Sequence, residues 1–449
     1  MKEFFKNHRF SILIALTGIV FYISFAYNLD RTDFIKLIGL YGGLFFMSFR
    51  LIQLEKTNFW FLAGLALLYR LIFLFALPNL SQDYYRFIWD GKLILEGINP
   101  YLFKPTELIP DFQGIWADLY QGMGSLSQGN YTSYPPINQF IFAVSALVGG
   151  KSILGSVIII RILIILADLG TLFFGRKLLQ NFGLPHHQIF WFILNPFIII
   201  ELTGNLHFEG VMLFFLIVSL YLLHKEKWLA SAVLLGVSVS VKLIPLIFLP
   251  LLWNYFRKNQ QLKIQKLGFY YATVAITVVL TFLPFLSSEL FSNFSASIGL
   301  WFQKFEFNAS IYYLIRWIGF ELKGYNIIAT AGRVLPILTL LIILGLAFFR
   351  RNRSIKTLIT SMLFGITAYF FLSTTVHPWY LATPLLLSVF TKYRYMILWT
   401  GLVFLSYFAY SNPDFEESYW LLATEYVAVF GYLIYEISRK EFQTKKPVI

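Results

Sequence analysis

The sequence has no cysteine, and only 13% of its 449 residues are charged. The lack of cysteine excludes disulfide bonds and thiolate metal sites. The lack of charge excludes a soluble globular protein, which carries about a quarter charged residues. Hydrophobic residues instead make up 58% of the chain, with 49 Phe and 27 Tyr. This composition is typical of a protein that crosses the membrane many times, with aromatic side chains at the lipid and its interfaces.

Several sequence motifs are also missing. The chain contains no GxxxxGK[ST] loop, no HExxH zinc motif and no glycine-rich nucleotide loop. No stretch resembles a soluble domain or an internal repeat, so residues 1–449 are interpreted as a single integral-membrane domain. A nucleotide-activated sugar would need a soluble domain for its binding. Any activated donor would therefore reach its site through the bilayer, most simply as a lipid phosphate.

The net charge of +13 does not indicate a nucleic-acid partner. Lys and Arg fall in short clusters between apolar runs, which is the pattern of topology signals in membrane proteins. Runs of ~20 apolar residues predict spans, and about 12 to 14 such segments can be placed. With the basic clusters in the cytoplasm, both termini lie inside, and residues 79–135 and 287–325 lie outside. We therefore predict an all-α transmembrane bundle with a long outer-face loop that carries short interfacial helices.

Two segments do not match a simple span. The apolar run 137–149 is short for a crossing, so we expect a helix that dips into the membrane. Residues 228–254 start and end beside basic residues, which requires a hairpin of two short helices. Pro245 removes a backbone donor and restricts the residue before it, so the turn is expected near 240–245. This turn would place Lys242 at the outer face.

Two carboxylates begin the predicted outer loop. Asp83 and Asp90 are seven residues apart and share one face if the segment is helical. They could be solvated loop carboxylates, or partners of Arg86 and Lys92. Alternatively, one is a general base and the second tunes it or holds substrate hydroxyls.

Further polar side chains fall on the same predicted side. His207 and Glu209 form a weak candidate pair of metal ligands. His377 lies beside Pro-Trp-Tyr and could bind a phosphate, orient a carboxylate or belong to an interfacial aromatic belt. Lys242 suits a phosphate as a point charge, or it snorkels to the headgroups.

Two charged residues lie inside one predicted span. Arg161 and Asp168 are seven residues apart, and charges within a membrane are costly unless paired. We expect them to contact each other or other groups inside the bundle, in a structural role.

These motifs together resemble the GT-C superfamily of integral-membrane glycosyltransferases. The resemblance is strongest to polyprenol-phosphate-mannose-dependent mannosyltransferases and covers about residues 58–391. The outer loop here follows three spans rather than one. The motifs that carry the resemblance are DYYRFIWDG (Asp83–Gly91), GINPY (Gly97–Tyr101), YPPINQ (Tyr134–Gln139), NLHFE (Asn205–Glu209), KLIP (Lys242–Pro245) and HPWY (His377–Tyr380).

The resemblance implies an inverting single displacement at the outer face of the membrane. Asp83 would act as the base toward an acceptor hydroxyl, and Asp90 matches the second acidic position. A polyprenyl-phosphate sugar would be the donor, a lipid or glycan the acceptor, and the hexose would be mannose. Neither a cofactor nor a metal ion is expected. The remaining residues assigned to substrate and phosphate binding are Arg86, His207, Glu209, Lys242, Arg316, Arg333, His377, Trp379 and Tyr380.

Two other functions stay open at this stage. A transporter or flippase of lipid-linked sugars would need essential charges in mid-membrane, such as Asp168 and Arg161. A glycan ligase or polymerase would release a lipid diphosphate instead of a monophosphate. In each case the expected location is the cytoplasmic membrane of a bacterium, with the site on the periplasmic side.

Overall fold

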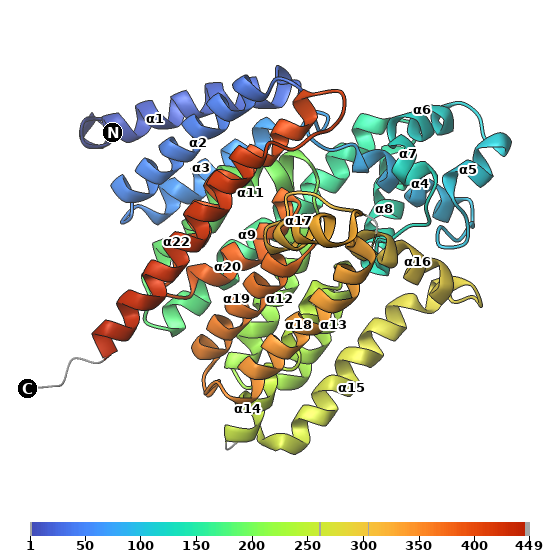
Figure 1. The fold of residues 1–449 in the computed structure, drawn as a ribbon. Coiled ribbons are helices and arrows are strands. Elements are labelled where there is room, and N and C mark those ends of the chain that lie inside the picture. Colours follow the sequence, from blue (N-terminus) through green and yellow to red (C-terminus); the bar gives the residue numbers. More distant parts are fainter. Residues whose placement is uncertain (1, 260–261, 304, 445–449) are drawn as a thin grey trace, which may run out of the picture.

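The protein is a bundle of helices, as the sequence predicts (Figure 1). The computed structural model describes residues 2–259, 262–303 and 305–444. Within these ranges there is no β-strand, and the one extended pairing is a bridge between Phe307 and Thr375. This bridge joins two segments that lie far apart in the sequence, just before α17 and just after α19.

Seven helices in the described ranges are long and apolar enough to cross a membrane. This length fits the bilayer, because a helix rises about 1.5 Å per residue and the hydrocarbon core is about 30 Å thick. The seven are α1 (Lys2–Tyr27), α2 (Phe34–Leu54), α9 (Ile153–Asn181), α15 (Lys263–Phe282), α18 (Ile328–Phe348), α19 (Ile355–Leu372) and α22 (Tyr419–Thr444).

The other expected spans are shorter or broken helices, which is why the seven are fewer than the 12 to 14 segments placed from the sequence. One bent pair, Pro196–Gly204 with Glu209–His224, turns by 113° at its break. The apolar helix α8 (Pro136–Gly149) has only 14 residues. The other shorter apolar segments are α3 (Phe59–Ile72), α12 (Glu209–His224), α13 (Trp228–Val241), α21 (Tyr395–Leu402) and η7 (Val403–Ser411).

Proline begins several of the short segments, because its fixed φ suits the first helical turn and its missing N–H ends the preceding helix. Pro196, Pro245 and Pro378 each stand at such a start. The break expected at 240–245 is therefore present. The segments are η2 (His186–Ile189), α10 (Phe190–Ile193), α11 (Pro196–Ile198), the π-helix η3 (Ile199–Gly204), η4 (Ile244–Phe248), α14 (Leu252–Lys258), η5 (Leu283–Phe285), η6 (Pro378–Leu381) and α20 (Ala382–Val389).

The expected outer loop 79–135 consists of short helices, as predicted. In Figure 1 they gather on the right of the bundle, whereas the first turns of α1 and the last turns of α22 lie on the left. Asn293 and Ser297 donate hydrogen bonds to the carbonyls of Tyr101 and Tyr131, so the second segment, 287–325, packs on the first. The helices of the two segments are α4 (Asp83–Leu95), α5 (Pro105–Leu108), η1 (Ile109–Asp111), α6 (Ile115–Gly122), α7 (Gly124–Gln128), α16 (Leu290–Gln303) and α17 (Ile311–Lys323).

Helix α4 is packed tightly against α8. A Cβ added to Gly91 would lie 2.2 Å from the carbonyl oxygen of Phe142, so only glycine allows the two backbones to come this close. The Phe87 and Phe142 rings stack with centroids 4.7 Å apart. This packing fixes the position of Asp83, the first residue of α4.

The charges inside the membrane helices are held by structural contacts. Arg70 Nε donates to Asp168 Oδ2 over 2.7 Å. Arg161 donates to four backbone carbonyls, including those of Thr203 and Gly204 at the end of η3. A direct contact between Arg161 and Asp168 was one of the two expected arrangements. The structure shows the other, in which each residue is bound within the bundle.

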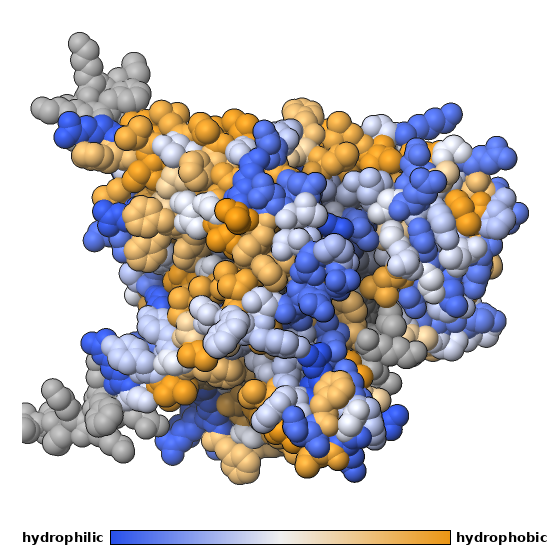
Figure 2. All heavy atoms as spheres, turned by 45° about the horizontal axis from the view of Figure 1, so that its top comes forward, coloured by the Kyte–Doolittle hydropathy of each residue, from blue (hydrophilic) through white to orange (hydrophobic). Residues whose placement is uncertain are grey.

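The surface supports a membrane protein. Large apolar side chains are exposed on several spans, with Ile35 86%, Phe269 67% and Val427 72% accessible. Figure 2 shows apolar residues over broad areas at the upper left, and hydrophilic residues concentrated on the right. Lipid is the solvent in which such exposed surfaces are stable.

Candidate active site

One cavity brings together six of the residues predicted from the sequence. It has a volume of about 220 Å³ and is formed by α4, the start of α8, the bend before α12, the end of α13 and the loop after α19. These segments come from widely separated parts of the chain. The six residues are Asp83, His207, Lys242, His377, Trp379 and Tyr380.

Asp83 is the acid of this cavity. It begins α4, where the helix dipole favours a negative charge. Tyr134, from the turn before α8, donates to its Oδ2 over 3.3 Å. Burial raises the pKa of Asp83 above its ordinary value, while Lys242 and the Tyr134 hydrogen bond oppose this shift. A carboxylate with a raised pKa is a better proton acceptor than an ordinary aspartate.

Lys242 supplies positive charge to the same cavity. Helix α13 ends at Val241, and Lys242 has an extended backbone that turns its side chain toward the N-terminus of α12. There its ammonium forms an ion pair with Glu209, whose carboxylate is completely buried. The ammonium also lies 5.8 Å from the centroid of the Tyr380 ring. Lys242 remains partly accessible, with 19% of its side chain exposed.

Three rings stack in a column on the cavity wall. His207 stacks on Trp379 with centroids 3.8 Å apart, and Trp379 stacks on His377 at 4.5 Å. Burial, with a smaller effect from Lys242, lowers the pKa of His377 to about 3. The His377 ring is therefore neutral at ordinary pH, and the positive charge of the empty cavity comes from Lys242.

Asp90 and Arg86 do not reach the cavity. The two are bound to each other, with Arg86 Nε 2.7 Å from Asp90 Oδ1 and Asp90 completely buried. Gln139 donates to the second oxygen of Asp90 over 3.0 Å. Seven residues do place Asp83 and Asp90 on one helical face, but they also separate them by about 10 Å along the axis. Asp83 therefore lines the cavity, whereas Asp90 lies further along α4 and holds that helix in place through its contacts with Arg86 and Gln139.

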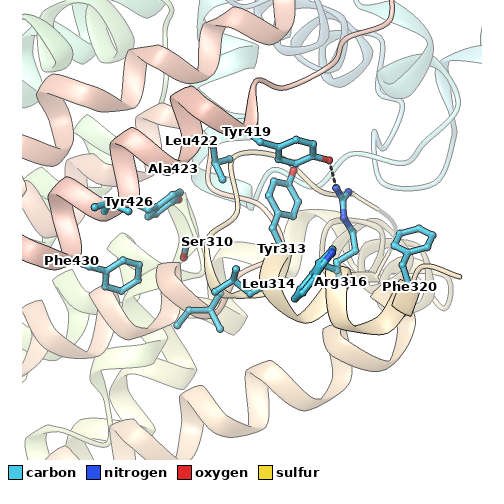
Figure 3. A pocket seen from close by; sticks show the side chains of 13 residues that line it. Ser310, Tyr313, Leu314, Arg316, Phe320, Tyr419, Leu422, Ala423, Tyr426 and Phe430 are labelled. Carbon is cyan, nitrogen blue, oxygen red and sulfur yellow. Dashed lines mark hydrogen bonds between the residues drawn. The ribbon is translucent and has the colours of Figure 1, made fainter. Parts of the chain in front are cut away.

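The two remaining arginines also lie elsewhere. Arg316, on α17, binds Glu306 Oε1 over 2.6 Å and the hydroxyl of Tyr419 over 2.7 Å. It borders a different, largely apolar cavity of about 590 Å³ between α17 and α22 (Figure 3). Arg333 is exposed on α18 and does not line the Asp83 cavity.

Several lining residues were absent from the predicted set. Tyr369 carries no signal in the sequence, because an aromatic residue in an apolar helix such as α19 is ordinary, and Phe87 lies inside the DYYRFIWDG motif without being distinguished from its other aromatic residues. Tyr134 was not assigned a role of its own, although the Tyr-Pro-Pro turn before α8 was interpreted as a possible wall of the site. Its hydroxyl makes the hydrogen bond to Asp83.

Comparisons with known proteins identify the family of the chain. Residues 31–257 match the model of the MptA/MptB family, described as alpha-(1->6)-mannopyranosyltransferase, N-terminal domain. The chain belongs to this family. The match covers Asp83, His207, Glu209 and Lys242, whereas the His377 loop lies beyond it.

Individual mannosyltransferases are also similar over most of the chain. Alpha-(1->6)-mannopyranosyltransferase A of Corynebacterium glutamicum is 25% identical over 356 residues, which is 72% of this chain and 70% of that protein. The protein of the same name from Mycobacterium tuberculosis is 22% identical over 335 residues, 70% of this chain and 61% of its own length. The family and the helical membrane fold support a glycosyltransferase of the GT-C type.

Proposed function

We propose that the protein transfers a mannosyl group from a polyprenyl-phosphate mannose to a hydroxyl of a glycolipid or glycan acceptor. The observation that carries this proposal is the cavity itself, where a carboxylate with a raised pKa and a lysine ammonium line one space in a membrane protein. The family membership supports mannose as the sugar. The relatives' names favour an α(1→6) linkage in the product.

The reaction that suits these groups is a single displacement. Asp83 takes the proton of the acceptor hydroxyl as its oxygen attacks C1 of the sugar. The bond between C1 and the phosphate oxygen breaks, and polyprenyl phosphate leaves with the electron pair. Lys242 stabilises the charge on that phosphate, which needs electrostatic help more than a proton. A direct attack on the face opposite the leaving group inverts the configuration at C1.

The stacked rings of Trp379 and His207 are suited to the sugar. The ring edges that line the cavity can pack against the apolar C–H side of a hexose, while neutral His nitrogens can bond its hydroxyls. We place this site at the outer face of the bacterial cytoplasmic membrane, because the basic clusters of the sequence then face the cytoplasm. The contacts of Arg161 and Asp168 with the bundle favour an enzyme over a transporter, since neither charge is left for a moving substrate.

The test is transfer by the purified protein in lipid nanodiscs. Polyprenyl-phosphate [¹⁴C]mannose is offered with a lipid extract, and products are identified by mass and by the anomeric coupling in NMR spectra. We expect a mannosylated product and polyprenyl monophosphate. Asp83→Asn should lower kcat by about 10²–10⁴-fold, the usual contribution of a general base.

Asp118→Asn is the matched control, because Asp118 is an exposed carboxylate of the same segment. It should retain wild-type transfer. Release of a lipid diphosphate would indicate a ligase instead. Movement of labelled donor across the bilayer without a new glycosidic bond would indicate a flippase. Full activity of Asp83→Asn would remove Asp83 from the mechanism.

A further inference from the structure

A buried glutamate lies behind the ring column of the cavity. Glu201 is completely buried in η3 and does not line the cavity. Its Oε1 accepts a hydrogen bond from the Tyr407 hydroxyl over 2.7 Å. Its Oε2 lies 3.6 Å from Nε2 of His207, which does line the cavity. Within the described residues neither of these last two atoms makes a hydrogen bond of good geometry, and the Asn205 side chain also lies near enough to act on the Glu201 carboxyl.

The backbone between the two residues is built for this approach. In a regular helix, residues six apart point in different directions, about 120° from each other. Here the π-helix Ile199–Gly204 is followed by a 113° bend, and Leu206 adopts a positive φ of 62°. π-Segments and strained non-glycine residues are uncommon and concentrate at functional sites. Together they bring His207 Nε2 back toward the Glu201 carboxyl.

We propose that Glu201 is a positioning residue that shares one proton with His207 and thereby sets which imidazole nitrogen carries a hydrogen. The inference rests on the proposed function, because His207 acts there on the sugar or its phosphate. A shift of less than 1 Å would bring Oε2 and Nε2 from 3.6 Å to hydrogen-bond distance. The second partner of a histidine ring commonly fixes its tautomer in this way.

The position of the proton decides what His207 offers to the ligand. A carboxylate buried away from water is far more costly than a neutral carboxylic acid, so the shared proton rests on Glu201. Its O–H then donates to Nε2, and Nδ1 carries the ring hydrogen as a donor toward a phosphate or hydroxyl oxygen. When alkali removes the shared proton, the remaining ring hydrogen moves from Nδ1 to Nε2, where it donates to the Glu201 carboxylate, and Nδ1 becomes an acceptor.

Other titratable groups surround the pair and act on the same equilibrium. Glu209 and Lys242 face it from α12 and α13, His377 from the loop after α19, and tyrosines from α2 and η7. A charge change at any of these would move the pH of the switch, so variants must conserve them. The tyrosines are Tyr41, Tyr407 and Tyr410.

The decisive measurement reads the tautomer directly, without donor or acceptor. The chain has only six histidines, so ¹⁵N-histidine labelling of the full protein in nanodiscs gives few signals, and His207→Gln identifies the one from His207. We expect the wild-type ring to change from the Nδ1–H to the Nε2–H form as pH rises. In Glu201→Gln the amide can accept from Tyr407 and donate to Nε2 at every pH, so the ring should stay Nδ1–H throughout.

Kinetics provide the second arm. Because the switch turns Nδ1 of His207 from a donor into an acceptor, we expect the kcat of the wild type to decline at alkaline pH. Glu201→Gln should keep kcat near neutral pH and lose this decline. Tyr395→Phe is the control, because it removes a buried hydrogen bond to Thr367 without touching the pair, and should keep the wild-type tautomer change. The same His207 signal in wild type and Glu201→Gln across the pH range would overturn the inference. Failure of mannosyl transfer with an intact tautomer switch would overturn the proposed function alone.

Discussion

Lys242 is shared between two acids: its ammonium binds Glu209 in an ion pair, and its charge opposes the burial that raises the pKa of Asp83. The site thus holds two carboxyls and one cation before any substrate arrives. A phosphate that binds Lys242 competes with Glu209 for it. If the protein acts as proposed, binding of the leaving group to Lys242 would therefore change the proton affinity of Asp83.

Removal of this cation should change the pH dependence of transfer. Because Lys242 lowers the pKa of Asp83, Lys242→Met lets that pKa rise, and the base becomes protonated at higher pH. The acid limb of kcat/KM should move to higher pH, and KM for the donor should increase. An acid limb that stays in place would show that the ammonium does not act on Asp83. Lys225→Met, an exposed lysine after α12, should leave the profile unchanged.

The double variant Lys242→Met/Glu209→Gln separates the effect of the Lys242 charge on the pKa of Asp83 from the contact of Lys242 with the donor phosphate. It removes one positive and one negative charge together, so the acid limb should move less than in Lys242→Met alone. The donor KM should stay high, because the phosphate has lost its cation in both proteins.

The Arg86–Asp90 pair should be needed for stability rather than for chemistry. Arg86→Met leaves the completely buried Asp90 without its cation, and such a loss costs about 3–5 kcal/mol. Replacing both residues, as in Arg86→Met/Asp90→Leu, should recover part of this loss. Thermal unfolding in nanodiscs, followed by tryptophan fluorescence, measures both. A kcat loss as large as that of Asp83→Asn, in a protein of normal stability, would contradict this assignment.

The close contact of α4 and α8 should tolerate no side chain. In Gly91→Ala the new Cβ would meet the Phe142 carbonyl, so the helices must separate, at a cost of about 1–3 kcal/mol. Because α4 carries Asp83, kcat should fall as well. Gly268→Ala in α15 is the matched control, since its Cβ meets nothing within 4 Å, and it should be neutral or slightly stabilising.

Arg316 and Arg333 were expected to bind phosphate, but the structure places neither at the cavity. Arg316→Met and Arg333→Met should each keep the donor KM within about twofold of wild type, in contrast to Lys242→Met. Arg316→Met should lower the unfolding temperature, because it removes the cation that binds Glu306 and Tyr419 and leaves Glu306 with only the hydrogen bonds from Tyr312 and Asn326. A tenfold rise in donor KM for either variant would show that this arginine does take part in donor binding.

Independence from metal ions remains a prediction, and it has a simple measurement. Lys242 already provides a fixed positive charge for the phosphate, so EDTA should leave the transfer rate unchanged. Loss of transfer in EDTA, restored by Mg²⁺ or Mn²⁺, would assign the cation role to a metal.

The sequence was most informative where charge and proline interrupt apolar runs. Asp83, Lys242 and His377 stand at such interruptions, and the structure brings all three to one cavity. Spacing alone could not separate Asp83 from Asp90, because helical phase says nothing of depth along the axis, and it was the family resemblance that assigned the base to Asp83. The sequence also could not identify Phe87 or Tyr369 as lining residues, since their role depends on how distant helices pack.

The ring column has a further consequence for the competition between acceptor and water. The stacked rings of His207, Trp379 and His377 are mostly carbon, so their few ring nitrogens are the groups of the column that could anchor water beside the reacting carbon. The acceptor hydroxyl belongs to a glycan whose other groups can contact the protein, whereas a water molecule lacks such contacts. We therefore expect hydrolysis of the activated sugar to be rare compared with transfer, so that the lipid donor is conserved until an acceptor is present.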